Sequence, residues 1–396
     1  MKLQELMSPD YADNPFPLYQ KLHEQGPLIR GGEKVIISGS HAAVEALLSD
    51  RRVGKSYMDS VRFRFGDDAA ELPIFQSMNR MFLVLNPPEH ARLRGLVMKS
   101  FSTKEIKPFR EMTLTVAKDL IGKLEGRHSC DLAQEFAFPL PVRIICRMLD
   151  IPETDALELG DAVSALVSVF DPQITEEALV KACLAFAELE EYFGALILSR
   201  RGSQANDLVS LFLRSENDGD ALQHDEIIAN VIMLFIAGHE TTSNMLCNTI
   251  LALHDNPAEL ELLKRDHTLI PSAIAECTRY DSSVQMLYRT VLEDVEVMGQ
   301  LIPRGTNLFL SLGAANHDPA VFSAPARLNI LRREGRSLSF GAGIHYCMGY
   351  RLALAEMEIA LEVLLTQLPG MQIVTEGIQR NRRANLRGVC TLPVTW

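Results

Sequence analysis

The sequence has no hydrophobic run long enough to cross a membrane and no stretch of low complexity. Its densest apolar segment, residues 231–236, is far shorter than the roughly 20 residues that a membrane-spanning helix needs. Residues 1–6 lack the apolar core of a secretion signal. No Gly/Ser linker, proline-rich tract or internal repeat divides the 396 residues. We therefore expect a soluble, cytoplasmic protein with no membrane anchor, folded as one large domain over residues 1–396.

Positive charge and paired cysteines are also scarce. The net charge of −12 disfavours nucleic acid and anionic membranes as partners. The seven cysteines are scattered, and none belongs to a C-x-x-C pair. That spacing is typical of reduced thiols in a cytosolic enzyme rather than of a disulfide framework. We expect only Cys347 to be reactive, and the others to be ordinary core or surface residues.

Helical patterns dominate, so we expect a mainly α fold with a small β-rich region. The longest predicted helix, about 222–254, would reach about 50 Å. The spacing of Ser102 and Glu105 is typical of a capping box for a following helix. We expect residues 51–88 to be irregular and strands to occupy 35–37 and parts of 284–310. The other predicted helices begin near Asn14 and cover about 41–49, 136–149, 153–169, 175–200, 206–215, 271–281 and 348–368.

The most informative segment is the loop Phe340–Gly349, in which one cysteine stands just before a predicted helix. The positive end of a helix dipole stabilises a thiolate at that position. Gly341 and Gly343 have no Cβ, so this backbone can lie against a large flat group. A single thiolate suits heme iron, whereas zinc takes several protein ligands. Cys347 is therefore the predicted metal ligand, and the alternative is a buried structural cysteine.

This loop resembles the heme-binding signature F-x-x-G-x-x-x-C-x-G of the cytochrome P-450 monooxygenases. Three further motifs follow the family's order: His90–Arg94 resembles its H-x-x-x-R, Ala237–Thr242 its A-G-x-[DE]-T-T, and Glu276–Arg279 its E-x-x-R. The resemblance covers nearly the whole chain from Asn14 onward. It implies the cytochrome P-450 fold in a single domain, heme b (iron protoporphyrin IX) as cofactor, and a soluble bacterial member of the macrolide and polyketide hydroxylase type.

The resemblance also implies catalytic roles for four residues of the long helix. Gly238 removes a side chain where a ligand must approach the backbone. The hydroxyls of Thr241 and Thr242 can bond to a helix carbonyl, and we expect them to open the helix locally. Thr242 would hold the hydrogen bond on the oxygen side, and Glu240 would relay protons. Ordinary helix packing is the alternative for the threonines.

Heme propionates need cations, and arginine matches a carboxylate with two parallel donors. The resemblance places such cations on separate segments of the chain, and it also places an aromatic shield and a glycine beside the iron ligand. The predicted cofactor-binding residues are His90, Arg94, Arg289, His345, Phe340, Gly341 and Cys347.

Glu276 and Arg279 stand three residues apart on one predicted helix, so their side chains can pair. A solvated surface pair of this kind contributes less than about 1 kcal/mol. The resemblance implies instead a buried pair with a third arginine, which supports the loop under the heme. Arg327 is the preferred third partner and Arg332 the alternative. We expect this trio to have a structural role, not a catalytic one.

The predicted activity is insertion of one oxygen atom of O₂ into an apolar small molecule, by hydroxylation or epoxidation, in secondary metabolism. No flavin or iron–sulfur segment is evident, so a separate ferredoxin with its reductase, or a flavodoxin, would supply electrons to a monomer. Arg351 and residues near Arg92 or Lys99 are candidate docking residues, with an ordinary solvated face as the alternative. A peroxygenase is disfavoured because Glu240 and Thr242 are both present, and a heme-based sensor without turnover is the remaining alternative.

Overall fold

The computed structural model describes residues 3–6, 8, 10–100, 106–171, 174–205, 207–215, 222–381 and 383–396. Two compact units make up the chain. The first unit holds residues 1–53, 106–141 and 241–396, and the second holds 54–105 and 142–240. The single-domain organisation predicted for residues 1–396 stays a prediction.

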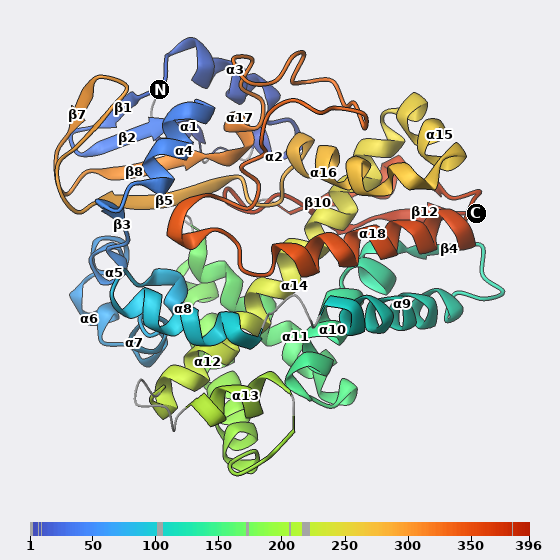
Figure 1. The fold of residues 1–396 in the computed structure, drawn as a ribbon, viewed down its shortest axis with the longest axis horizontal. Helices are drawn as coiled ribbons and strands as arrows, with labels where there is room; N and C mark the ends of the chain where they lie inside the picture. The colour runs from blue at the N-terminus through green and yellow to red at the C-terminus, as the bar shows by residue number, and fades with distance from the viewer. Residues whose placement is uncertain are drawn as a thin grey trace. The chain divides into compact units, whose positions relative to one another are not determined.

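Helices dominate both units, as the sequence predicts (Figure 1). The first unit contains α1 (Leu3–Leu6), α2 (Asp10–Asp13), α3 (Phe16–Glu24), α4 (His41–Ser49), α9 (Ile106–Gly122), α15 (Pro257–Arg265), α16 (Ile270–Tyr280), α17 (Leu312–Ala315) and α18 (Tyr350–Gln367). The second contains α5 (Tyr57–Phe65), α6 (Asp67–Ala70), α7 (Pro73–Met78), α8 (Glu89–Ser100), α11 (Glu153–Val167), α12 (Glu176–Ser199) and α13 (Leu208–Ser215). Two helices contribute residues to both units: α10 (Pro139–Leu149) and α14 (His224–His254).

The β-rich region centres on a five-stranded sheet in the order β1-β2-β8-β5-β3. Its strands are β1 (Ile29–Gly32), β2 (Val35–Ser38), β3 (Val53–Gly54), β5 (Met286–Val291) and β8 (Asn307–Ser311). Strand β8 runs parallel to β2 and antiparallel to β5, which opposes Arg289 to Leu308. The smaller sheets hold β4 (Ser129–Asp131), β6 (Val295–Val297), β7 (Gln300–Ile302), β9 (Gln372–Ile373), β10 (Gln379–Arg380), β11 (Val389–Thr391) and β12 (Pro393–Thr395).

Two details differ from the sequence predictions, and a third is not described by the structure. Residues 51–88, predicted to be irregular, form α5, α6, α7 and a 3-10 turn at Phe82–Val84. These helices are short and carry little amphipathic pattern, so periodicity could not identify them. The last helix begins at Tyr350 rather than Met348, since Gly349 occupies its N-cap position. The predicted capping box at 102–105 lies outside the described residues.

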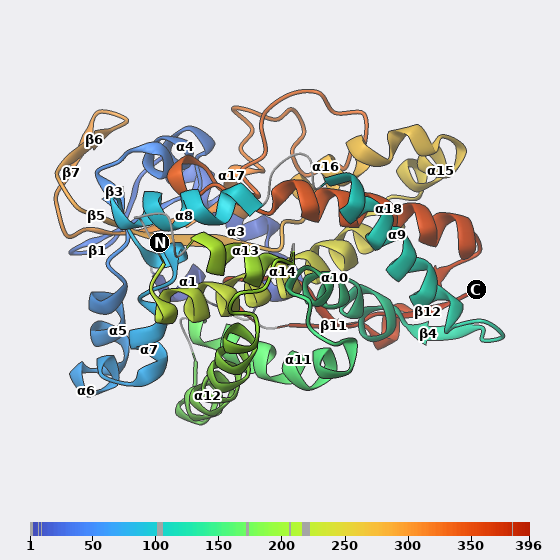
Figure 2. The ribbon, with the colours of Figure 1, turned by 60° about the horizontal axis from the view of Figure 1, so that its bottom comes forward.

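In the first unit, one apolar cluster joins the sheet to the segment that carries Cys347. Leu47 of α4, Val291 of β5 and Leu310 of β8 are buried together with Leu338 and Ala342. Beyond this cluster, α18 packs along α9 and against α16 (Figure 2). The Cys347 segment is therefore anchored to the sheet at one end and to a helical layer at the other.

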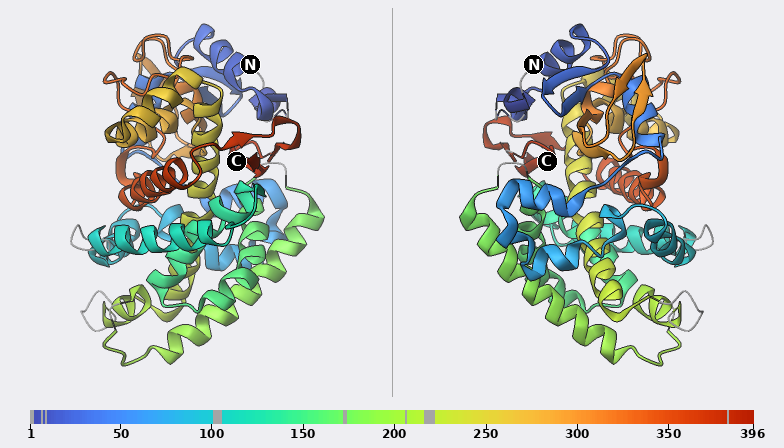
Figure 3. Two further views of the ribbon diagram at one scale, coloured as in Figure 1. Left: turned by 90° about the vertical axis from the view of Figure 1, so that its right-hand side faces the viewer. Right: turned by 90° about the vertical axis from the view of Figure 1, so that its left-hand side faces the viewer.

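In the second unit, the long helix α12 packs against α11 (Figure 3). Buried Asn230 of α14 fixes the chain after α7, because its side-chain amide donates to the carbonyl of Arg80 at 3.1 Å and accepts from the amide of Phe82 at 2.9 Å. Across the described residues, no helix combines the length and apolarity that crossing a bilayer requires.

Candidate functional site

The loop around Cys347 is held by its own backbone. The amide of Cys347 donates to the carbonyl of Phe340 at 2.9 Å, and the amide of Gly341 donates to the carbonyl of Leu338 at 2.7 Å. A 3-10 turn at Gly343–His345 lies between these two points. Cys347 is partly buried and stands just ahead of α18. The thiol is thus presented from a fixed loop at a helix N-terminus, as the sequence predicts.

Two observations explain why position 343 is a glycine: its backbone conformation and the closeness of α4. Its φ is +68°, in the left-handed region that favours glycine. A Cβ here would overlap the carbonyl oxygen of Leu48, at the end of α4. Glycine therefore lets the Cys347 loop lie directly on α4.

Arg289 is a buried cation on the strand beside this loop. Leu287 and Arg289 share one face of β5, and a Cβ on Gly341 would contact Leu287 at 3.7 Å. The Arg289 guanidinium donates to the Tyr288 carbonyl at 2.8 Å, and no carboxylate of the described residues forms an ion pair with it. Burial lowers the pKa of Arg289 to about 10. A buried guanidinium without a protein anion is suited to an acidic ligand.

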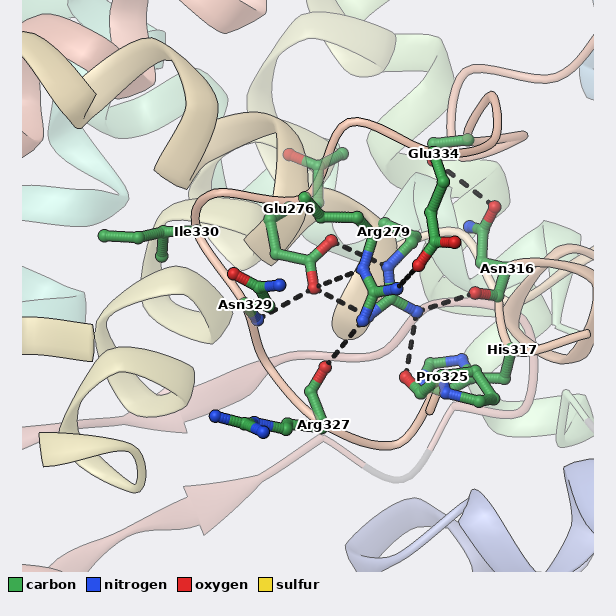
Figure 4. Close-up of polar contacts among 12 residues, drawn as sticks. Glu276, Arg279, Asn316, His317, Pro325, Arg327, Asn329, Ile330 and Glu334 are labelled. Carbon is green, nitrogen blue, oxygen red and sulfur yellow. Dashed lines mark hydrogen bonds and ion pairs between the residues drawn. The ribbon is translucent and has the colours of Figure 1, made fainter. Parts of the chain in front are cut away.

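The predicted pair of Glu276 and Arg279 is buried and forms two hydrogen bonds. Arg279 Nε lies 2.8 Å from Glu276 Oε2, and its Nη2 lies 2.9 Å from Oε1. Arg279 Nη1 also donates to the carbonyls of Asn316 and Pro325, at 2.8 and 2.9 Å. Figure 4 shows this network closing around the Glu276 carboxylate. Every charge in it has a partner, so it can be stable away from water.

The third arginine is Arg332, and the preference for Arg327 was wrong. Arg332 Nε donates to Glu276 Oε1 at 3.1 Å, and its side chain is 5% exposed. Arg327 is exposed and contributes its backbone carbonyl, which accepts from Arg332 Nη2 at 3.1 Å (Figure 4). The amide of Asn329 completes the site at 3.0 Å from Glu276 Oε1.

Asn316 links this network to the Cys347 loop, a role that the sequence did not reveal. While its carbonyl accepts from Arg279, its side-chain oxygen accepts from the amide of Leu338 at 2.7 Å. Its side-chain nitrogen donates to the hydroxyl of Ser339 at 2.8 Å, and that hydroxyl donates to the carbonyl of Thr278 on α16. The segment that enters the loop is therefore tied to α16 by side chains.

The predicted catalytic residues Gly238, Glu240, Thr241 and Thr242 follow one another on α14. Ala237 is exposed although residues 231–236 are buried, so this turn has an accessible face. Thr242 is buried and Glu240 is partly buried. The helix continues as regular α-helix through both threonines, so the predicted local opening is not observed.

The other predicted cations lie on two separate elements. His90 and Arg94 stand one turn apart on α8 in the second unit, with His90 buried and Arg94 partly exposed. Burial first, and then the charges of Arg94 and Lys55, lower the pKa of His90 to about 4. His90 is therefore a neutral hydrogen-bonding group at pH 7. His345, on the 3-10 turn of the Cys347 loop, is partly buried.

The candidate docking residues differ from one another. Arg351 is exposed at the start of α18. Arg92 instead pairs with Glu226 at 2.5 Å with both side chains largely buried, so the structure does not favour it as a docking residue. The side chain of Lys99 lies outside the described part of the chain.

Glu356 of α18 is a buried carboxyl group that the sequence did not single out. Its residue is 4% exposed, and Oε2 has no hydrogen-bond partner among the described residues. Burial raises its pKa to about 8. This group is therefore mostly protonated at neutral pH.

Comparison with known proteins identifies the class. The family model described as cytochrome P-450 matches residues 29–368. A Xylella fastidiosa (strain 9a5c) relative assigned to the same family is 50% identical, covering 100% of this chain and 98% of its own length. The chain belongs to the cytochrome P-450 family, and it is a monooxygenase that uses heme b.

Two solved structures share the fold. The structure of P-450 BioI in complex with an acyl carrier protein ligated to hexadec-9Z-enoic acid has a TM-score of 0.91 and 29% identity, with 98% of this chain and 100% of that chain covered. PksS, the cytochrome P-450 of the Bacillus subtilis 168 bacillaene polyketide synthase, has a TM-score of 0.88 and 30% identity, with 98% of each chain covered.

The residues of the first unit fit a heme. Cys347 offers one thiolate from a loop that contains Gly341 and Gly343, and buried Arg289 offers a cation suited to a propionate. Within the described residues, no group of three or more His, Cys, Asp or Glu side chains could hold a metal ion.

Proposed function

We propose that this protein inserts one oxygen atom of O₂ into an apolar small molecule in secondary metabolism, by hydroxylation or epoxidation, in the cytoplasm. The observation that carries the proposal is the single cysteine on a glycine-bearing loop ahead of α18, beside a buried arginine. Thiolate-ligated heme iron supplies the chemistry when bound: it activates dioxygen for transfer of one oxygen atom while the other leaves as water.

The chain's own residues orient the cofactor and handle protons. Cys347 would hold the iron, with Phe340 and Gly341 against the heme. Arg289 and His345 would hold the propionates, together with His90 and Arg94 of α8. On α14, Gly238 would leave room for a ligand, Thr242, next to Thr241, would hold the hydrogen bond on the oxygen side, and Glu240 would pass protons from solvent. The support is the accessible turn at Ala237 and the burial of Thr242.

For the substrate, we propose an acyl or polyketide chain. One structural neighbour was solved with a fatty acyl chain on a carrier protein, and another belongs to a polyketide synthase. Electrons would come to a monomer from a separate ferredoxin and its reductase, or from a flavodoxin. Exposed Arg351 is the candidate contact for such an acidic partner.

The first test replaces the proposed iron ligand. Cys347→Ser should abolish the shifted Soret band of the ferrous–CO complex, since that band requires thiolate ligation. Cys390→Ser, which changes an exposed cysteine, should leave the band unchanged. A retained band in Cys347→Ser would refute the assignment.

The second test addresses the substrate class. Fatty acids, acyl chains on a carrier protein, macrolactones and steroids are titrated into the ferric protein, and the low-to-high spin shift is recorded. A saturable shift with acyl or polyketide ligands, followed by oxygen consumption coupled to NAD(P)H and product formation, supports the proposal. A shift confined to steroids would contradict it, and gas binding without any product would indicate a sensor.

A further inference from the structure

Two tyrosine rings lie between two arginines beside the iron ligand. The ring centroids of Tyr346 and Tyr350 are 5.2 Å apart, with an interplanar angle of 66°. The guanidinium carbon of Arg336 lies 5.5 Å from the Tyr346 centroid, and that of Arg351 lies 5.6 Å from the Tyr350 centroid. Both arginines are exposed and both tyrosines are partly exposed. We call Tyr346 and Tyr350 the tyrosine pair.

The tyrosine pair reaches from the iron ligand to the surface. Tyr346 is the residue directly before Cys347, so one peptide bond joins the pair to the iron ligand. Tyr350 packs edge-to-face on Phe340, with centroids 6.1 Å apart, and the Phe340 carbonyl accepts the Cys347 amide. Electron transfer between adjacent groups needs short separations, and the ring spacing of this pair meets that need.

The surroundings of Tyr350 also allow a proton to leave. A phenol that loses one electron becomes a strong acid and must release its hydroxyl proton. Arg351 Nε donates to the Tyr350 hydroxyl oxygen at 2.9 Å, so the hydroxyl hydrogen points away from this arginine. Because the residue is partly exposed, water can accept that proton.

We propose that the tyrosine pair is an outlet for oxidising equivalents that form at the heme when no substrate is oxidised. In each step, one electron passes from a tyrosine to the oxidised heme centre, and the phenolic proton leaves to water. A neutral tyrosyl radical remains, and a surface reductant such as ascorbate or a thiol restores the tyrosine by returning one electron and one proton. This step would protect the heme and Cys347 from oxidation. The inference rests on the proposed heme ligation by Cys347.

The experiment uses the full-length, heme-loaded ferric protein without substrate. A peracid is added, and samples are frozen within milliseconds for electron paramagnetic resonance. We expect a tyrosyl radical that largely disappears in the double variant Tyr346→Phe/Tyr350→Phe. The same variant should lose its Soret absorbance faster under peracid, and ascorbate should slow that loss in the wild type more than in the variant. Phenylalanine keeps both rings in place, so the loop packing is preserved.

A control variant and an independent readout make each result decisive. Tyr11→Phe changes a partly exposed tyrosine of α2 in the same unit and should leave the radical intact. The ferrous–CO band must be normal in every variant, which separates failure of this inference from failure of heme ligation. A normal band with a radical that persists in the double variant, or with no tyrosyl radical in the wild type, would overturn the proposal.

Discussion

Two kinds of buried charge lie in the first unit, and they differ in whether the protein satisfies them. The Glu276 carboxylate accepts hydrogen bonds from Arg279, Arg332 and the amide of Asn329, so its negative charge is balanced within the fold. Arg289 is equally buried, yet its guanidinium has no carboxylate partner among the described residues. Glu356 is buried as well, but burial favours its neutral form, so it carries a proton instead of a charge. A buried charge whose partners all lie within the fold has a structural role. A buried ionisable group without such a partner either binds a charged ligand or becomes neutral by keeping or losing a proton.

Breaking the closed network should have the largest effect. Glu276→Gln removes the carboxylate that Arg279 and Arg332 share, and only Arg332 keeps another anion, Glu334. Losing one partner of a buried pair costs about 3–5 kcal/mol. We expect a much lower unfolding temperature and poor heme incorporation, measured by thermal denaturation and by the ratio of Soret to protein absorbance. The control Arg327→Ala changes an exposed side chain and should stay within about 0.5 kcal/mol. Equal losses in the two variants would contradict the closed network.

Removing the unmatched charge should have a smaller and different effect. Arg289→Met keeps an unbranched side chain of similar length and eliminates a desolvated cation, so the fold should not weaken. The bound heme should leave faster by about 10- to 100-fold, since a hydrogen bond to a charged group contributes about 1.5–3 kcal/mol. Transfer of heme to apomyoglobin measures this rate. Arg30→Met, an exposed arginine on β1 of the same sheet, is the matched control. An unchanged rate would mean that Arg289 holds no propionate.

The effect of Glu356 should depend on pH, and it should be smallest near pH 5, where little of it has developed. Its pKa in the folded protein is raised from about 4.5 to about 8 by burial. The folded state therefore keeps this proton more tightly than the unfolded chain. As the pH rises through that window, the protein should lose up to about 1.4 kcal/mol of stability per pH unit, with no further loss above it.

The Glu356→Gln variant should lack this contribution, so its unfolding temperature should rise relative to wild type as the pH increases from 5 to 8. Thermal denaturation across this range measures the difference. Glu362→Gln changes an exposed residue of the same helix and should follow the wild type. A pH-independent difference between wild type and Glu356→Gln would show that the carboxyl is already ionised in the folded protein.

The features that could be predicted from the sequence are those fixed by local pattern. The long α14, the strands after α16 and the loop with Cys347 all follow from periodicity, glycine positions and turn residues. Arg332 could not be chosen over Arg327, because residues 323–336 form no helix or strand whose period would orient their side chains. The role of Asn316 could not be predicted either, because its partners Arg279 and Leu338 are distant from it in sequence.

The pairing of Arg92 with Glu226 was hidden for a related reason. Spacing identifies neighbours within one helix, but it does not show which residue of α14 faces α8. Glu356 shows the opposite problem. In a helical pattern, a lone glutamate is usually solvent-facing, and only the packing of α18 against α9 and α16 reveals that it is enclosed.

The hydrogen bonds from Asn316 to Leu338 and Ser339 have a consequence for how the holoenzyme assembles. They are made by the polypeptide alone, so the entrance to the cysteine loop can acquire its shape before any porphyrin arrives. The cofactor would then bind to a preformed site. The rate of heme binding would depend on access to that site more than on refolding of the loop. Supplying porphyrin late in expression should therefore still give a fully coloured enzyme.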